Sequence, residues 1–402
     1  MPLKIIPRLN ITPIPGLLKE FFRLMASKKI LKGNYIEEFE EEFANYIGSK
    51  HAITVPSGRY GMKLILECLK LKRGDEIIVP SYTMGALPII IKKMGIKPVF
   101  IDIEQKGFNI DTNLIEKKIT KKTKAILATH LFGTSCDINK ILKIAKKYKL
   151  YVIEDGVNSL GTNFKGKKVG SFGTAGFFSL EFRKPINTLD GGVVTTNDDE
   201  LAKQIRKKIK KLDYSYKNIL MKILIYYIEV FLLNSFFYYF ISRILHSKFR
   251  KKIRYFYQGY HGSSCYKFTN FQSVLGIKQL RGLDISNKNR IEKAKLLKRK
   301  LSKNKNIILP KPIKFSSHIY YSYVTRTNKD NQFISDELLK MGVDTSFGDD
   351  IMQNCPLSLN DTGKYPQLEK LMSTGLELPM YNRLTKKDIL LIANSVQRVI
   401  ND

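Results

Sequence analysis

Short apolar runs alternate along the chain, between residue 50 and about residue 200, with longer stretches in which apolar residues recur every three or four positions. The short runs predict β-strands and the longer stretches predict amphipathic helices. This alternation is typical of a parallel sheet with helices on both faces, so we predict an α/β fold. The predicted strands are AITV (52–55), EIIVP (76–80), PVFIDI (98–103), AILATH (125–130) and YVIED (151–155), and the predicted helices begin near Tyr60 and cover 86–94, 113–119 and 138–148.

A much longer apolar segment, ILMKILIYYIEVFLLNSFFYYFISRIL, occupies residues 219–245. Between Ile223 and Ile241 its one charged residue is Glu229, over about the length that crosses a bilayer. Basic clusters flank the segment on both sides, RKKIKK before it and SKFRKKIR after it, and such clusters favour the cytoplasmic side. We therefore predict a helical hairpin or in-plane amphipathic element, broken near Asn234–Ser235, that dips into the inner leaflet. The alternative is an extra helix pair buried against the protein or at a dimer contact.

The composition indicates a globular chain with ample material for a core. Its 402 residues suggest two or three domains, and 43% of them are apolar while 26% are charged. The formal net charge of +33 has three explanations: compositional bias, attraction to an anionic membrane, or attraction to a phosphate-bearing substrate. The basic residues are spread along the whole chain without an aromatic-interleaved basic patch, which argues against nucleic-acid binding.

The four cysteines, Cys68, Cys136, Cys265 and Cys355, lie far apart and form no CxxC pair. This spacing argues against a disulfide framework and against a structural zinc site, and it favours a reducing compartment. The opening MPLKIIPRLNITPIPG lacks the continuous apolar run of a secretory signal. We therefore expect a cytoplasmic protein, held at the inner face of the cell membrane if the apolar segment meets lipid.

Chemically useful residues follow several predicted strands, where an α/β sheet binds its ligands. AITV is followed by PSGRYGM, in which a Ser57-Gly58 turn opens a helix and suits a phosphate. Asp155 ends YVIED, and SYT after IIVP offers the ring of Tyr82. Each signal has a structural alternative: a plain turn, a capping aspartate and, for His130 in HLFG, a buried structural histidine.

Lys184, in SLEFRKPINTLDGG (179–192), gives these residues a common chemistry. A lysine amine forms a Schiff base with an aldehyde cofactor. Pyridoxal 5'-phosphate also needs an acid beside its ring nitrogen, an anion site for its phosphate and a flat partner for its ring. Asp155, the Ser57-Gly58-Arg59 turn and Tyr82 would supply these three needs. The sequence therefore predicts a pyridoxal-phosphate site.

The chain resembles the DegT/DnrJ/EryC1/StrS sugar aminotransferases, which have the aspartate aminotransferase fold type I. The resemblance runs from about residue 28 to the C-terminus, apart from the apolar segment, which has no counterpart in the family pattern. It implies a large domain over 1–262 with a mostly parallel sheet and an insertion at about 213–262, and a smaller α+β domain over 263–402. The segments that carry it are KGNYIEEFEEEFANYIGSKHAITVPSG, GDEIIVPSYT, KPVFIDIE, TKAILATHLFG, VIEDGVNSLG, KVGSFGTAGFFSLEFRK, FQSVLGIKQLRGLD and LPMYNRLT.

The resemblance implies a role for each candidate residue. Lys184 would be the Schiff-base lysine and proton shuttle, and Asp155 would keep the ring nitrogen protonated. Asn158 occupies the place of a family glutamine that contacts the ring hydroxyl. The phosphate would be bound by Ser179, Ser57 and the backbone of Gly58-Arg59, and Tyr82 would stack on the ring.

The chain departs from the family pattern at several positions. Arg59 stands where the family usually has threonine, and SLEFRK replaces a Ser-Phe-x-Pro-Thr-Lys type of segment. The family's asparagine from the partner subunit should fall near Cys265, where no asparagine stands. YYSYV and SFGDD occupy small-domain regions where the family often has histidines.

The resemblance implies an aminotransferase that moves an amino group, with glutamate as the expected donor, to a nucleotide-linked keto-sugar in cell-surface polysaccharide or glycan biosynthesis. A lipid-linked acceptor is an alternative if the insertion meets membrane, and a homodimer is expected. One rival is other pyridoxal-phosphate chemistry, either a dehydratase or a desulfurase that uses Cys355. The other rival is a catalytically inactive protein that binds a membrane surface.

Overall fold

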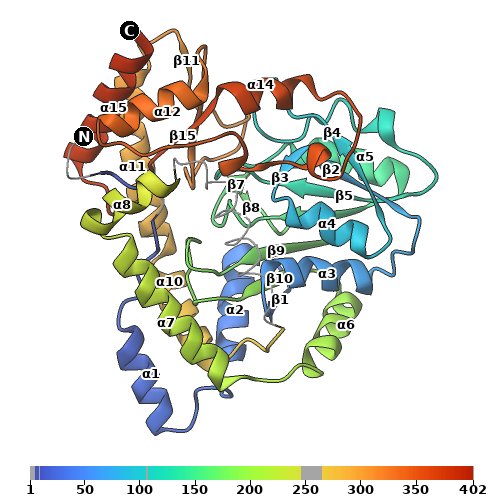
Figure 1. Ribbon diagram of the computed structural model, residues 1–402. Helices are drawn as coiled ribbons and strands as arrows, with labels where there is room; N and C mark the ends of the chain where they lie inside the picture. The colour runs from blue at the N-terminus through green and yellow to red at the C-terminus, as the bar shows by residue number, and fades with distance from the viewer. Residues whose placement is uncertain (1–4, 9, 106, 246–264, 402) are drawn as a thin grey trace.

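The computed structural model describes residues 5–8, 10–105, 107–245 and 265–401. A seven-stranded sheet with the order β1-β10-β9-β6-β5-β2-β4 forms the centre of the larger part of the molecule (Figure 1). Every neighbouring pair is parallel except the two pairs that β10 makes, so the predicted mostly parallel α/β sheet is confirmed. The strands are β1 (His51–Val55), β2 (Glu76–Pro80), β4 (Lys97–Ile101), β5 (Thr123–Thr129), β6 (Tyr151–Asp155), β9 (Ala175–Ser179) and β10 (Gly192–Thr196).

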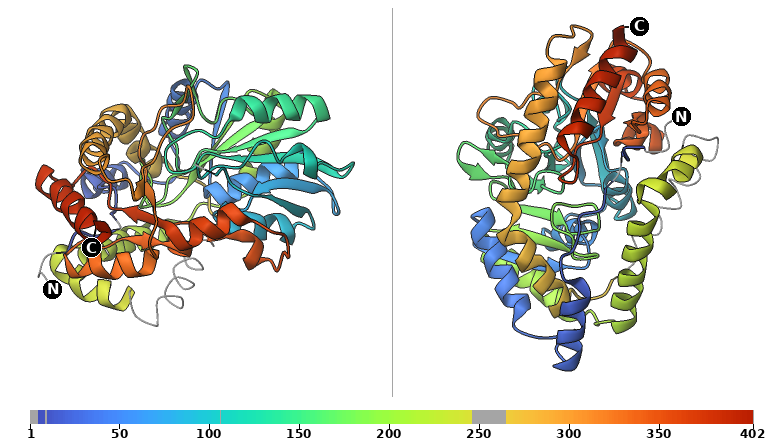
Figure 2. Two further views of the ribbon diagram at one scale, coloured as in Figure 1. Left: turned by 90° about the horizontal axis from the view of Figure 1, so that it is seen from above. Right: turned by 90° about the vertical axis from the view of Figure 1, so that its left-hand side faces the viewer.

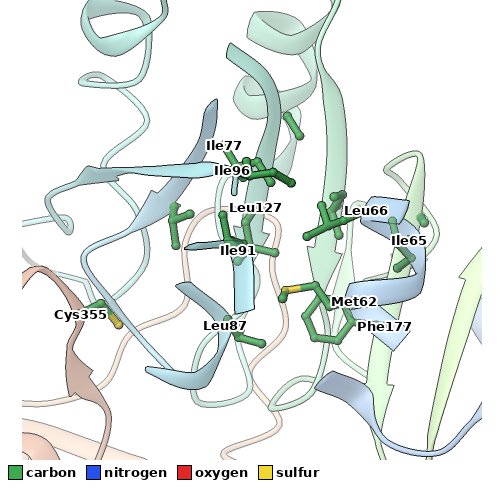
Figure 3. Close-up of a cluster of buried hydrophobic side chains, with 14 of the residues drawn as sticks. Met62, Ile65, Leu66, Ile77, Leu87, Ile91, Ile96, Leu127, Phe177 and Cys355 are labelled. Carbon is green, nitrogen blue, oxygen red and sulfur yellow. The ribbon is translucent and has the colours of Figure 1, made fainter. Parts of the chain in front are cut away.

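Helices cover both faces of this sheet, which explains why its strands are nearly continuous apolar runs. On one face, α3 and α4 pack their apolar residues against Ile77, Leu127 and Phe177 (Figure 3). On the other face, α5 packs against Ile78 and Ile126. Ile77 and Ile78 therefore serve opposite cores because side chains alternate along a strand. The helices of this part are α2 (Tyr35–Ile47), α3 (Gly58–Cys68), α4 (Ala86–Lys93), α5 (Ile138–Tyr148), α6 (Asp199–Lys210) and α10 (Asn270–Arg281).

The structure corrects one predicted helix. The prediction over 113–119 is wrong, because this region holds a single 3-10 turn, η1 (Glu116–Lys118). Asp111 Oδ1 accepts hydrogen bonds from the backbone and the side-chain nitrogen of Asn113, at 2.9 and 2.8 Å. Such local bonds offer the backbone an alternative to a helix. The predicted helices over 86–94 and 138–148 are confirmed as α4 and α5.

A second, antiparallel sheet with the order β11-β12-β15-β13 lies beside the first part and has its own core. The helix α10 packs against α2 of the first part, whereas α11, which follows it, belongs to the second core. The predicted division at residues 262 and 263 stays a prediction. The elements of this part are α11 (Leu283–Leu301), β11 (Ile307–Ile308), β12 (Tyr323–Thr327), α12 (Asn331–Lys340), β13 (Ser346–Phe347), η2 (Gly348–Asp350), α13 (Cys355–Ser358), α14 (Pro366–Thr374), β15 (Gly375–Leu378) and α15 (Lys386–Asn401).

The beginning of the chain completes this second core. Ile6 is buried there; its N–H donates to Gly342 O at 2.8 Å, and its carbonyl accepts from the N–H of Asp344 at 3.1 Å. Arg8 forms ion pairs with Asp344 and Asp350, at 3.6 and 3.0 Å. Residues more than 300 positions apart are therefore joined. The remaining short elements are α1 (Leu17–Ala26), β3 (Tyr82–Thr83), which pairs with β14 (Gln353–Asn354), and β7 (Asn163–Phe164), which pairs with β8 (Lys167–Lys168).

The apolar segment folds as two helices, α7 (Tyr216–Leu232) and α8 (Ser235–Leu245), so the predicted break near Asn234–Ser235 is confirmed. The two helices lie along the outside of the molecule (Figure 2, right). Within the described ranges, no single helix has the length and apolar content to cross a bilayer. The helix α7 together with residues 237–243 of α8 passes that test by length and composition, but the pair bends by 88° at the break.

The two faces of α7 have unusual compositions. Its buried face packs Ile219, Ile223 and Tyr226 into a cluster with α1 and carries Lys222 and Glu229, the latter also buried. Its outer face carries the exposed Lys217 near the start of the helix and, from residue 220 onward, only large apolar or aromatic side chains among the exposed ones. They are Leu220, Met221, Leu224, Tyr227, Ile228 and Phe231. The charges of the central part of this helix thus point inward, and apolar groups point outward.

Candidate active site

A cavity of about 330 Å³ lies at the carboxyl ends of the central strands. Residues that directly follow or end β1, β5, β6 and β9 line it, as expected for an α/β sheet. The second part of the chain closes it with Tyr321 and residues 349–353. Of the residues predicted for the site, the structure brings together Ser57, Gly58, Arg59, Asp155, Asn158, Ser179 and Lys184.

Lys184 lies on the loop between β9 and β10, with its side chain in the cavity and only 13% exposed. Its Nζ donates to Tyr321 OH at 3.2 Å and to Asn158 Oδ1 at 3.4 Å. The loop is fixed from outside the sheet, because Thr12 Oγ1 donates to the Lys184 carbonyl at 2.7 Å. Burial alone lowers the pKa of Lys184, but the attraction of Tyr321, Glu181 and Asp155 outweighs it, and the pKa is raised.

Asp155 is the last residue of β6 and is buried at the floor of the cavity. Its Oδ1 accepts a hydrogen bond from the N–H of Val157 at 3.1 Å. Burial raises the pKa of Asp155 to about 6, against the opposing effects of this hydrogen bond and of the Lys184 charge. An ionised Asp155 is therefore costly alone, and a cation beside it would offset this cost.

The turn between β1 and α3 presents a helix N-terminus to the cavity. Ser57 has an extended backbone and caps α3, accepting a hydrogen bond from the N–H of Tyr60 at 3.2 Å. A Cβ added at Gly58 would meet Phe178 O at 3.1 Å and Ser179 Cβ at 3.2 Å. The glycine therefore lets the turn approach β9 closely. Together with the helix dipole and Arg59, this cradle suits an anion.

Glu154 and His130, which neighbour the site in sequence, have structural partners. Glu154 accepts hydrogen bonds from the N–H groups of Gly170, Phe172 and Gly173, at 2.7 to 2.8 Å. The N–H of Cys136 donates to His130 Nδ1 at 3.2 Å, so Nδ1 is an acceptor and the ring proton on Nε2 is directed to Glu154, 3.1 Å away. The structural interpretation of His130 therefore fits the structure.

The structure corrects the placement of Tyr82. Its ring is 1% exposed, packs edge-on against Phe132 with centroids 6.3 Å apart, and does not line the cavity. The next residue, Thr83, lines the cavity instead, because successive side chains on β3 point to opposite sides. Met84 also lines the cavity near this position. The predicted stacking role of Tyr82 is therefore wrong for this arrangement.

The cysteines considered for function lie elsewhere. Cys355 is fully buried at the start of α13, at the margin of the cluster in Figure 3, and it does not line the cavity. Burial raises the pKa of its thiol to about 12, which disfavours the nucleophilic thiolate that a desulfurase needs. Cys265 is exposed and does not line the cavity, and most of the neighbouring region, 246–264, lies outside the described residues.

Several side chains that line the cavity were missed by sequence reasoning, and Tyr321 and Glu229 are two of them. Tyr321 lies in YYSYV, where the absence of the family's histidine was the available signal, and its hydroxyl contacts Lys184. Glu229 reaches the cavity from α7, inside the long apolar segment. A single glutamate in the apolar run was visible in the sequence, but the sequence did not show that Glu229 reaches the cavity.

These residues fit pyridoxal phosphate: an amine for the aldehyde, a buried acid for the ring nitrogen, and a glycine cradle at a helix N-terminus for the phosphate. The fold and this site define a pyridoxal-phosphate-dependent transferase of fold type I. The sequence model of the DegT/DnrJ/EryC1/StrS aminotransferase family matches residues 16–397. The chain belongs to this family and is a pyridoxal-phosphate-dependent aminotransferase.

Similar proteins cover nearly the whole chain. An uncharacterized protein of Methanocaldococcus jannaschii is 32% identical over 96% of this chain and 95% of its own length. The GDP-perosamine synthase of Escherichia coli O157:H7 is 30% identical over 92% of each chain. The crystal structure of an aminotransferase from Psychrobacter cryohalolentis has a TM-score of 0.80 and 26% identity, and the match covers 98% of this chain and 100% of that one. These matches confirm the expected family and fold.

Proposed function

We propose that this enzyme transfers an amino group from an amino acid, glutamate, to a nucleotide-linked keto-sugar in the synthesis of cell-surface polysaccharide. The observation that carries the proposal is the meeting of Lys184 and Asp155 in one cavity beside the N-terminus of α3. The similarity to a GDP-perosamine synthase, which is named for a nucleotide-linked amino sugar, supports the acceptor class. The net charge of +33 suits an acceptor that carries phosphates.

When bound, pyridoxal phosphate supplies the electron sink and the carbon that carries the amino group between donor and acceptor. Lys184 would hold the cofactor through Nζ and would take up and return a proton at that atom. Tyr321 OH and Asn158 Oδ1, both within 3.4 Å of Nζ, hold the amine in place between these two tasks. Asp155 keeps the ring nitrogen protonated, because its buried carboxylate is stabilised by a cation.

The phosphate of the cofactor is held at the start of α3. The N–H groups of Gly58 and Arg59 and the hydroxyls of Ser57 and Ser179 would donate to its oxygens, and the guanidinium of Arg59 would add a positive charge. Asn158 lies three residues after Asp155, and its amide would hold the ring hydroxyl. The second part of the chain, through Tyr321 and residues 349–353, shields the site from water.

The test of this proposal is a pair of half-reactions. The purified wild type should show the visible absorption of lysine-bound cofactor, lose it with L-glutamate, and regain it with a nucleotide-linked keto-sugar. Lys184→Ala should lack that absorption and both half-reactions, while Lys167→Ala, an exposed lysine on β8, serves as the matched control. A Lys184→Ala protein with the wild-type absorption would refute the assignment of the lysine.

A homodimer is part of the proposal, on the strength of the family resemblance. Sedimentation of the holoenzyme should give twice the chain mass of 46.3 kDa. A particle of a single chain with full activity would contradict it.

We further propose that the enzyme works in the cytoplasm, at the inner face of the membrane, with the outer face of α7 against lipid. The support is that six large apolar or aromatic side chains are exposed on one face of this helix, each at least 41%. Leu224 and Phe231, at 55% and 56%, are the most exposed. Burial of such surface in the interface stabilises association, and neighbouring Lys and Arg residues add about 1 kcal/mol each near anionic lipid.

Flotation with vesicles of phosphatidylglycerol and phosphatidylcholine tests this contact. The wild type should float with the vesicles, less so at high salt, and Leu224→Ser should weaken flotation. Leu357→Ser, at an even more exposed leucine on α13 (69%), is the control and should float like the wild type. If Leu224→Ser instead splits the dimer and leaves flotation unchanged, the outer face of α7 is a subunit contact and not a lipid contact.

A further inference from the structure

The helix α7 is held over the cavity by specific contacts of its inner face. Lys222 Nζ forms an ion pair with Asp190 Oδ2 at 3.0 Å, with both side chains nearly buried. One turn later, Tyr226 OH accepts a hydrogen bond from the N–H of Ile14 at 3.0 Å, and its ring contacts Phe182 with centroids 6.2 Å apart. Asp190 and Phe182 lie on the loop that carries Lys184. The helix is therefore seated on the active-site loop itself.

Glu229 is the next residue on this inner face, three positions after Tyr226 and seven after Lys222. Its side chain is buried, with 6% of the residue exposed, and it lines the same cavity as Lys184 and Asp155. Burial is the largest cause of the raised pKa of Glu229. The positive charges of Arg183 and Lys222 lower this pKa, and the negative charge of Glu181 raises it further. The apolar helix α7 thus places a carboxyl group in the active site.

Other acids of the cavity are tied to different tasks. Asp155 interacts with Lys184 and the N–H of Val157, and Asp350 pairs with Arg8 at 3.0 Å. Glu181 lies 3.9 Å from Lys184 Nζ. Glu229 comes from another element, α7, and lines the cavity from that side. This position suits a side chain that binds the substrate, whereas Asp155 would serve the cofactor.

We infer that Glu229 is a binding residue for the sugar ring of the acceptor and takes hydrogen bonds from its hydroxyl groups. Neighbouring hydroxyls of a sugar are O–H donors, and a carboxylate accepts two such bonds with high strength. An acceptor that lacks the hydroxyls would lose these hydrogen bonds and bind more weakly. The inference rests on the proposed function and adds the residue that selects the acceptor.

The test compares two amino donors that start from the same cofactor form of the full-length holoenzyme. L-glutamate reports the donor half-reaction, and GDP-perosamine, run in reverse, reports the sugar site. Glu229→Gln should raise the GDP-perosamine concentration for half-maximal conversion about 10- to 100-fold, since a hydrogen bond to a charged group is lost. Its reaction with L-glutamate and its cofactor absorption should match the wild type, which also shows that the variant folds.

Two further variants sharpen the result. Glu229→Asp keeps the charge but shortens the reach, so it should fall between the wild type and Glu229→Gln. Glu200→Gln, an exposed glutamate on α6, is the matched control and should react like the wild type with both donors.

The outcomes separate the inference from the function. Unchanged GDP-perosamine dependence in Glu229→Gln, or a loss confined to L-glutamate, overturns the role of Glu229 and leaves the aminotransferase intact. A wild type that reacts with L-glutamate but not with GDP-perosamine counts against the nucleotide-sugar proposal, and the role of Glu229 falls with it.

Discussion

Replacing Asp155 with asparagine should stabilise the cofactor-free chain while abolishing its activity. Burial raises the pKa of Asp155 from 3.8 to about 6, so the ionised carboxylate is disfavoured in the folded state. The chain therefore loses stability as pH rises from about 4, and the loss levels off above about pH 7, at about 3 kcal/mol. The asparagine side chain would keep the shape and the acceptor for Val157 N–H without the charge.

The pH dependence makes this prediction specific. Between pH 5 and pH 8 the cost of ionising Asp155 grows by about 1.4 kcal/mol. In urea unfolding of the cofactor-free chains, the free energy of unfolding of the variant relative to the wild type should rise by that amount from pH 5 to pH 8. Added pyridoxal phosphate should favour the wild type, since a cation beside Asp155 removes the cost. Asp213→Asn, at an exposed position, is the control. A difference between Asp155→Asn and the wild type that stays constant with pH would refute the reasoning.

Three more substitutions probe other parts of the site. Tyr321→Phe removes the hydrogen bond to Lys184 Nζ and should slow the single-turnover reaction with L-glutamate about 10- to 100-fold, whereas an unchanged rate would deny Tyr321 a part in holding the amine. Gly58→Ala places a Cβ 3.1 Å from Phe178 O, so a cofactor titration should show binding about tenfold weaker or more; equal affinity would mean that the turn is not the phosphate cradle. Cys355→Ser should keep the transfer rate within about twofold, because the thiol lies outside the cavity, and a large loss would revive the thiol chemistry.

The sequence was most informative where local rules decide the structure. The strands that carry Asp155 and Ser57 are short apolar runs followed by polar residues, and parallel strands bring their carboxyl ends to one edge. Lys184 was found because its chemical partners occur at those ends. The prediction of a helix over 113–119 was wrong because Asp111 accepts local hydrogen bonds from Asn113. The spacing of apolar residues contains no information about such bonds.

Long-range packing accounts for what could not be predicted. Tyr82 and Thr83 are neighbours, but the alternation of a two-residue strand sends one into the core and the other to the cavity. Tyr321 follows Lys184 by 137 residues in the sequence, and only the folded structure shows that its hydroxyl contacts the amine. Glu229 depends on where α7 docks, which is set by contacts such as Lys222 with Asp190.

The pairing of Ile6 and Arg8 with residues near 344 has a consequence for biosynthesis. Arg8 leaves the ribosome well before Thr345, which accepts a hydrogen bond from it and follows 337 residues later. At roughly 5–20 residues per second, translation of that stretch takes about 17–70 s. During this interval the first strand-like segment has no native neighbour, and the apolar helices α7 and α8 have already emerged. Ile6 and Arg8 can therefore form these native contacts only after the region around residue 344 has been synthesised.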